Sequence, residues 1–331
     1  MFEVTPKVET YKTKYVIFSH LLLSGHSPTC CKRFPLSGYW PRRTRLKGVI
    51  SRAETAALAA IVLWATLAPI SAILGNLPPF FVTGTGLLIG SVISIAVSRG
   101  QLSRLKVPPK TLLVGVYGLF GFHAALFAAL QLAPAIQANL INYLWPLLLV
   151  VLSPIFLTGI SLRAKHVIAA LIGFLGAALA ITSGGEMTSG SVVGYLFAFL
   201  AAVIWATYSL LTKRVPHFDS SAVGLFALVS GLLALVAHLV FETPVNPTTS
   251  QWLLLLALGL GPLGGAFYLW DYALKHGDPQ RLGLLSFLTP LLSTTLLLIA
   301  TGKELTWLLA VSGVLIVGAA FFGSRDRASI D

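Results

Sequence analysis

Long apolar segments of similar length, separated by short polar connections, fill most of this chain. At a rise of 1.5 Å per residue, each segment is long enough as a helix to cross the hydrocarbon core of a bilayer. The pattern therefore predicts an all-α integral membrane protein with ten transmembrane helices, at about residues 54–74, 78–97, 111–131, 134–157, 166–182, 192–212, 221–241, 251–274, 280–300 and 304–323.

Basic residues fall mainly in every second connection. Arg163 and Lys165 follow the fourth apolar segment, and Lys213 and Arg214 follow the sixth, whereas the odd-numbered connections lack Lys and Arg except for Lys303. Positively charged connections stay on the cytoplasmic side of a membrane. The alternation predicts that both termini face the cytoplasm.

The chain also repeats itself. Residues 140–148 match residues 284–292 at a spacing of 144, and Trp64-Ala-Thr matches Trp205-Ala-Thr. Spans one to five then correspond to spans six to ten, and because five is odd, the second half enters the membrane from the opposite side. This predicts an inverted 5+5 repeat, an architecture of secondary transporters, with repeats at residues 51–185 and 186–331.

Composition supports the membrane class, since 56% of the residues are hydrophobic and 10% are charged. The net charge of +12 does not point to nucleic acid, because ten of the Lys and Arg residues lie in the first 52 positions. A basic segment beside a first membrane helix is typical of topology control and contact with anionic lipid. Residues 1–50 are expected to form a disordered cytoplasmic extension, in which the adjacent Cys30 and Cys31 are unpaired thiols.

Polar and aromatic side chains interrupt the middle of the fourth span. Asn139, Asn142, Tyr143, Trp145 and Pro146 lie at a depth where each polar group needs a partner in protein or in a water-filled cavity. Aromatic belts belong at the membrane interfaces, so anchoring does not explain these rings. We expect them to line a substrate site, with core packing as the alternative.

Pro146 and Pro290 occupy equivalent positions in the repeat, each near the centre of its span. Paired helix breaks near the midplane indicate a transporter binding site, so these prolines are predicted to break or gate their helices. Trp145 corresponds to Thr289, and this difference between the halves is where we expect substrate choice to arise.

Other mid-span polar residues have two interpretations each. His123 shares a helix face with Phe127 and is either a packing residue or a site residue. The same two interpretations apply to Trp205. Tyr268 lies in the span that corresponds to the His123 span and is predicted to bind substrate. Asp271 lies one turn before Lys275, which favours a structural ion pair over proton coupling.

Catalytic signatures of membrane enzymes do not occur in this sequence. Gly259-Leu-Gly-Pro-Leu-Gly264 matches a dinucleotide-binding pattern but lies inside an apolar helix, where close helix packing and a kink at Pro262 explain it better. His238 and Glu242, near the outer end of the seventh span, are interpreted as interfacial. We expect no enzyme activity, cofactor or metal site.

Two motifs resemble a known family. Phe122-His-Ala-Ala125 with Asn142-Tyr-Leu-Trp-Pro-Leu-Leu148, and Tyr268-Leu-Trp-Asp-Tyr-Ala-Leu274, resemble the YddG-type aromatic amino acid exporters of the EamA-type branch of the drug/metabolite transporter superfamily. The resemblance covers about residues 50–325. It implies export of aromatic amino acids across the bacterial inner membrane, through a central cavity to which His123, Tyr143, Trp145 and Trp205 contribute.

The resulting hypothesis is an exporter that works by alternating access, with a small-molecule substrate and the lipid bilayer as partners and no nucleic acid or obligate protein partner. Aromatic walls suit an aromatic side chain, and Asn or His groups suit its charged amine and carboxylate. One alternative is export of other metabolites or drugs. Another is a membrane enzyme or lipid-handling protein, which would need a catalytic pair that the sequence does not offer.

Overall fold

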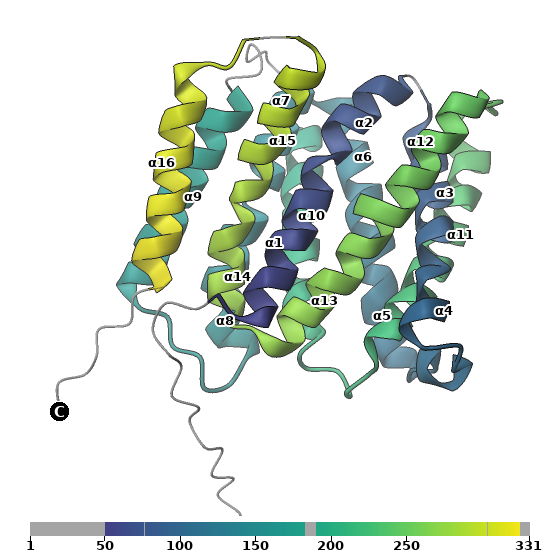
Figure 1. The fold of residues 1–331 in the computed structure, drawn as a ribbon, viewed down its shortest axis with the longest axis horizontal. Helices are drawn as coiled ribbons and strands as arrows, with labels where there is room; N and C mark the ends of the chain where they lie inside the picture. The colour runs from purple at the N-terminus through teal and green to yellow at the C-terminus, as the bar shows by residue number, and fades with distance from the viewer. Residues whose placement is uncertain (1–49, 76, 183–189, 303, 325–331) are drawn as a thin grey trace, which may run out of the picture. The chain divides into compact units, whose positions relative to one another are not determined.

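A computed structural model describes residues 50–75, 77–182, 190–302 and 304–324. All regular structure in these ranges is helical, and the helices stand side by side as one bundle (Figure 1). The predictions for residues 1–49, including the unpaired thiols of Cys30 and Cys31, fall outside the described residues, as do Lys303 and the basic residues Arg325 and Arg327.

The first half of the bundle forms five spans, several of them interrupted. Its helices are α1 (Arg52–Ala65), α2 (Leu67–Leu74), α3 (Pro79–Ser91), α4 (Ile93–Val97), η1 (Leu102–Leu105), α5 (Pro109–Val116), η2 (Tyr117–Gly121), α6 (Phe122–Leu132), α7 (Ala135–Asn142), α8 (Trp145–Phe156) and α9 (Ala164–Thr182).

The helices of the second half are α10 (Val192–Leu211), η3 (Ser220–Ala222), α11 (Val223–Phe241), α12 (Thr249–Leu260), η4 (Gly261–Gly265), α13 (Ala266–His276), α14 (Pro279–Ser286), α15 (Leu288–Ala300) and α16 (Trp307–Ser324). In this half the third and fourth spans are interrupted as in the first half, whereas the first two spans contain the continuous helices α10 and α11.

Nine helical segments in the described ranges are long and apolar enough to cross a membrane. They correspond to the first nine predicted spans, and α16 supplies a shorter apolar helix where the tenth was expected. Large apolar side chains such as Leu239, Phe241 and Val314 are exposed on the bundle. Exposed apolar surface of this extent fits a lipid environment, so the chain is a multi-pass membrane protein.

Corresponding spans of the two halves run in opposite directions. Gly277 lies close to both the end of α10 and the start of α1. Its carbonyl oxygen accepts from Lys213, just after α10, at 3.1 Å. A Cβ added to Gly277 would lie 3.2 Å from the Cβ of Ala53 in α1. The end of α10 and the start of α1 therefore lie at the same end of the bundle. The first spans of the two halves are antiparallel, as an inverted repeat requires.

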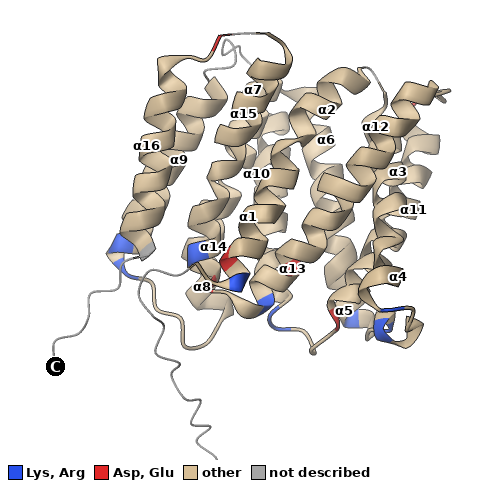
Figure 2. Cartoon of the chain, in the orientation of Figure 1, with Lys and Arg blue, Asp and Glu red and all other residues tan. Residues whose placement is uncertain are grey.

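Most Lys and Arg residues of the described chain lie at that same end, which we call the basic end (Figure 2). Lys213 also donates to the carbonyl oxygen of Leu274 and thereby caps the end of α13. Burial lowers the pKa of Lys213, and the charge of Asp278 partly opposes this shift. We call the opposite end of the bundle the far end.

The most extensive helix contacts join the two halves. They pair α9 with α16, α3 with α11, α6 with α10 and α1 with α13. Glycines allow α3 and η4 to approach closely: a Cβ on Gly90 would lie 2.7 Å from the Cα of Gly264 and 2.9 Å from the carbonyl oxygens of Gly259 and Leu263. The glycines of residues 259–264 thus serve helix packing, as expected, rather than nucleotide binding.

Two π turns lie at equivalent positions of the repeat. The first, η2, covers residues 117–121, and the second, η4, covers residues 261–265, a spacing of 144 residues. A π turn holds an extra residue, which rotates the following side chains by about 100° relative to an unbroken α-helix. Both His123 and its counterpart Phe267 line the cavity described below, and their ring centroids are 6.4 Å apart.

Candidate substrate cavity

A large cavity of about 590 Å³ lies between the two halves. It extends to Gly75 and Ala135 at the far end, next to the connections that follow the first and third spans. None of its described lining residues is Lys, Arg, Asp or Glu. Its aromatic and polar lining consists of Trp64, Ser71, Thr83, Phe122, His123, Phe127, Asn139, Asn142, Tyr143, Trp145, Trp205, Phe267, Thr289, Ser293 and Thr294.

Four indole rings form a closed cycle at one side of this cavity, which we call the tryptophan quartet. The ring centroids of Trp64 and Trp205 are 5.7 Å apart, those of Trp205 and Trp145 6.3 Å, those of Trp145 and Trp270 5.7 Å, and those of Trp270 and Trp64 5.4 Å. These separations are typical of favourable aromatic pairs. Each half of the chain contributes two rings.

The quartet separates the cavity from the basic end. Trp64, Trp145 and Trp205 line the cavity, whereas Trp270 is 1% exposed and donates from Nε1 to the Oγ of Ser209 at 3.2 Å. Trp270 is not among the lining residues, and α13 continues from it to the capped end at the basic side. The boundary between the cavity and the basic end is thus a contact between the halves.

His123 is held by its own helix and by aromatic rings. Its Nδ1 lies 2.6 Å from the carbonyl oxygen of Leu119, and since a carbonyl only accepts, Nδ1 carries the hydrogen. In the neutral ring this leaves Nε2 as an acceptor. The rings of Phe122, Phe127 and Phe267 surround the imidazole at centroid distances of 5.1, 5.9 and 6.4 Å.

The fourth and ninth spans are both broken beside the cavity. Helix α7 ends at Asn142 and α8 begins at Trp145, while α14 ends at Ser286 and α15 begins at Leu288. Proline has no N–H, so Pro146 cannot donate to the carbonyl oxygen of Asn142, nor Pro290 to that of Ser286. The paired discontinuities therefore leave backbone acceptors near mid-span.

Two polar atoms at these breaks have no hydrogen-bond partner. They are Oδ1 of Asn142 and Oγ1 of Thr289, in side chains that are 5% and 4% exposed and that line the cavity. A buried polar atom without a partner costs about 1–3 kcal/mol. Such a cost in a membrane protein marks these two positions as candidate ligand contacts.

Most residues expected at the substrate site border this one cavity: His123, Asn139, Asn142, Tyr143, Trp145, Trp205 and, of the helix-break residues, Pro290. Pro146 is buried at the break but does not line the cavity. Phe122 and Phe127 were noted only as neighbours of His123, and Phe267 was missed, because a phenylalanine inside an apolar span carries no polarity that would single it out as a site residue.

Tyr268 does not take the position expected of a substrate contact. It is absent from the cavity lining, and its hydroxyl donates to the carbonyl oxygen of Gly90 at 3.1 Å. At the repeat spacing of 144 residues the counterpart of His123 is Phe267, and it is Phe267 that lines the cavity. Tyr268 thus binds α3 to α13.

Asp271 and Lys275 form a buried ion pair away from the cavity lining. Lys275 Nζ lies 2.7 Å from Oδ2 of Asp271, donates to the carbonyl oxygen of Phe218 at 2.9 Å and stands 3.7 Å from the centre of the Phe218 ring. Ser220 Oγ accepts a further bond at 3.2 Å. The pair ties α13 to the connection before α11, which is a structural arrangement.

Glu242 fastens the two halves together at the far end. Its carboxylate accepts from the backbone N–H groups of Phe80 at 2.9 Å and Phe81 at 3.2 Å, in the first turn of α3, and Nδ1 of His238 lies 2.8 Å away. A carboxylate at a helix N-terminus is favourable. The sequence indicated an interfacial position for Glu242 and gave no sign of this long-range contact.

We expect Glu242→Gln to lower the free energy of unfolding by about 2 kcal/mol, because the amide offers one acceptor oxygen where the carboxylate offers two charged ones. Thermal unfolding in detergent measures the change. Glu304→Gln, at an exposed position in the last described connection, is the matched control and should leave the midpoint unchanged. Equal midpoints for the two variants would contradict a role for Glu242 in fastening α3.

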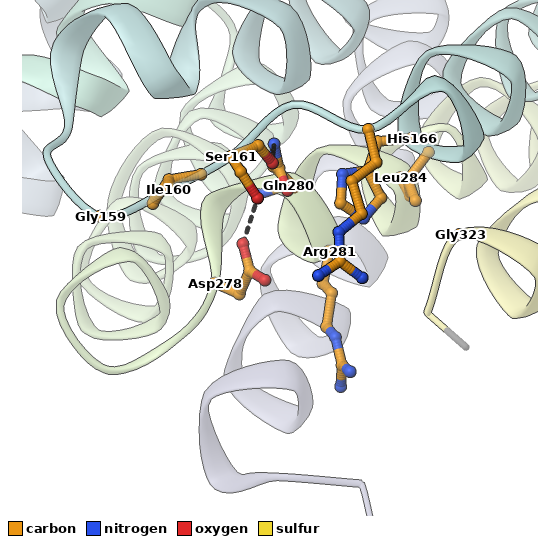
Figure 3. Close-up of a pocket in the computed structure, with 10 residues that line it drawn as sticks. Gly159, Ile160, Ser161, His166, Asp278, Gln280, Arg281, Leu284 and Gly323 are labelled. Atoms are coloured by element: carbon orange, nitrogen blue, oxygen red, sulfur yellow. Dashed lines mark hydrogen bonds between the residues drawn. The ribbon is translucent and has the colours of Figure 1, made fainter. Parts of the chain in front are cut away.

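A second pocket of about 200 Å³ lies at the basic end, where the connection after α8 meets the start of α14 (Figure 3). Arg163, His166 and Arg281 line it together with Asp278. Arg281 lies 3.6 Å from the carboxylate of Glu54. Its charged lining residues of both signs distinguish this pocket from the uncharged central cavity.

A bundle of apolar spans with two antiparallel related halves and a cavity between them defines a membrane transporter of the two-repeat class. Its sequence agrees with this class in both halves. The chain belongs to the EamA-like transporter family, which matches residues 51–182 and 192–325.

Relatives narrow the assignment within that family. The chain is 41% identical over 276 residues to the aromatic amino acid exporter YddG of Ancylobacter novellus, covering 82% of this chain and 96% of that protein. It is 24% identical to the exporter of the same name from Salmonella typhimurium, covering 77% and 91%. The protein is thus a YddG-like transporter of the drug/metabolite superfamily and acts on a small-molecule substrate.

The fold agrees with a solved structure as well. A crystal structure of a protein 41% identical in sequence matches with a TM-score of 0.77, covering 83% of this chain and 98% of the other. The two-repeat transporter fold therefore accounts for nearly the whole length of that protein.

Proposed function

We propose that this protein exports aromatic amino acids by alternating access through the central cavity. The observation that carries the proposal is the cavity itself, which combines a volume of about 590 Å³ with indole, phenyl and phenol walls and with no charged lining residue in the described ranges. Ligand sites of this size are mostly apolar with a few polar groups. The relatives named as aromatic amino acid exporters support the same substrate class.

The proposed cycle assigns the cytoplasmic side to the basic end, following the positive-inside rule, with both termini in the cytoplasm of a cell whose inner membrane the protein spans. The cavity, which extends to the far end, is then outward-facing. The tryptophan quartet closes the inner side. Opening inward requires the two halves to rock apart at the quartet while closing at the far end, as in transporters built from inverted repeats.

Transport is proposed to be facilitative or by exchange, without a covalent step. His123 takes no part in an ion pair in the described structure, and the ion pair of Asp271 lies away from the cavity. Neither arrangement calls for a coupled proton.

The test is efflux of labelled tryptophan or phenylalanine from proteoliposomes, with and without an imposed pH gradient. We expect flux above protein-free vesicles, competition by other aromatic amino acids, no competition by a nucleotide sugar or a drug-like cation, and insensitivity to the gradient. A monodisperse preparation that moves no aromatic amino acid would refute the substrate assignment. Flux that follows the gradient would instead refute facilitation.

A further inference from the structure

The cavity offers no formal charge to balance that of a ligand. Among the described residues that line it, every side chain is apolar, aromatic, hydroxyl, amide or imidazole. A ligand with one uncompensated charge would lose hydration there without gaining a counter-ion, which is costly. A zwitterion carries its own counter-charge, so the cavity favours a ligand with no net charge and two opposite charges close together.

Acceptors for the positive end are concentrated at the two helix breaks. The carbonyl oxygen of Asn142 has no donor from Pro146, and Oδ1 of the same residue has no partner in the described structure. Oγ1 of Thr289, in the first turn of α15 across the repeat, is likewise unpaired. An ammonium group has three donors and no acceptor, which is the complement of this set.

Donors lie around the same region. Trp145 begins α8, next to the break, and its indole, the indole of Trp205 and the phenol of Tyr143 border the cavity. Indole N–H and phenol O–H groups donate to a carboxylate without adding charge. The negative end of a zwitterion thus finds donors while its aromatic part stays against the rings.

We propose that Asn142 and Thr289 recognise the ammonium group of a zwitterionic α-amino acid and so select it over amines and carboxylic acids of the same ring structure. This inference rests on the proposed function and adds the discrimination between head groups. The two residues come from different halves and are not equivalents in the repeat. The ligand would replace the hydrogen bonds that both side chains lack in the described structure.

Competition against labelled tryptophan flux tests the inference with four probes that share the indole ring: tryptophan, tryptamine, indole-3-propionate and indole. In the parent protein we expect tryptophan to compete at least about tenfold better than either singly charged analogue. Asn142→Leu and Thr289→Val should each raise the concentration of tryptophan needed for half-maximal competition by about tenfold. The concentration of indole needed should stay within about twofold of the parent value. Thr295→Val is the matched control, because its hydroxyl already donates to the Leu291 carbonyl at 2.7 Å.

Asn142→Asp provides a second variant of nearly the same shape. Its carboxylate supplies the missing counter-charge. We therefore expect tryptamine to compete about tenfold better relative to tryptophan than in the parent protein, and indole-3-propionate to compete less well. The head-group assignment alone would be overturned by either of two results. One is an unchanged ratio of tryptamine to tryptophan competition in Asn142→Asp. The other is an equal loss of competition by tryptophan and by indole in Asn142→Leu. Failure of the parent protein to transport tryptophan would overturn the head-group assignment together with the proposed function.

Discussion

Replacing both Trp145 and Trp205 by alanine is expected to lower the specificity constant for tryptophan efflux by at least about tenfold. Each indole borders the cavity and belongs to the tryptophan quartet. Loss of one aromatic contact with the substrate costs about 1.4 kcal/mol, a factor of about ten. Because the two rings also contact each other, the two losses do not simply multiply, and the factor for one ring is the minimum expected. Initial rates of efflux from proteoliposomes over a range of internal tryptophan concentrations measure the change.

Two further variants separate binding from folding in this experiment. Trp145→Phe with Trp205→Phe keeps aromatic surface at both positions and should retain most of the flux. Trp307→Ala removes an indole that is 73% exposed at the start of α16 and should behave as the parent protein. Full flux in a double alanine variant that remains monodisperse would contradict the assignment of these rings to the substrate path.

Placing a single methyl group on Gly90 is expected to prevent stable folding. The new Cβ would lie 2.7 Å from the Cα of Gly264 and 2.9 Å from two backbone carbonyl oxygens, so the contact cannot be relieved by rotating a side chain. Overpacking against movable side chains already costs about 1–3 kcal/mol, and displacement of η4 should exceed this. The yield of monodisperse protein and its thermal unfolding midpoint should both fall steeply for Gly90→Ala.

Gly318→Ala is the matched control and should raise the thermal unfolding midpoint slightly instead of lowering it. Gly318 lies within the apolar helix α16, and a Cβ there meets no atom within 4 Å. Alanine in a helix interior is favoured over glycine by about 0.5–1 kcal/mol. A midpoint for Gly90→Ala equal to that of Gly318→Ala would show that α3 and η4 do not approach as closely as described.

The fourth span shows how far sequence reasoning reached toward the site. Asn142, Tyr143 and Trp145 stood out because polar and aromatic groups at mid-depth in an apolar segment are costly, and all three border the cavity. Phe267 did not stand out, although it contacts the rings of His123, Trp64 and Trp205. A polar group in an apolar span can be recognised from the sequence because its burial is unfavourable. A contact between apolar side chains of distant helices leaves no such pattern.

Tyr268 and Glu242 show where sequence reasoning stopped. Tyr268 was expected at the site because its span is the counterpart of the His123 span, but its hydroxyl instead donates to the carbonyl oxygen of Gly90 in α3. Glu242 was judged by its own span alone, while its partners Phe80 and Phe81 lie more than 160 positions earlier in the chain. No local pattern records a bond across that separation.

The sequence by itself determined the apolar spans, the repeat at a spacing of 144 residues, the uneven distribution of basic connections and the mid-depth polar cluster beside Pro146. Only the tertiary structure decided that Trp64, Trp145, Trp205 and Trp270 meet as one quartet and that the oxygens of Asn142 and Thr289 stay unpaired beside one cavity. The reason is physical. Periodicity and polarity belong to one helix at a time, but a site between helices depends on their relative depth and rotation, which packing, glycine contacts and π turns set together.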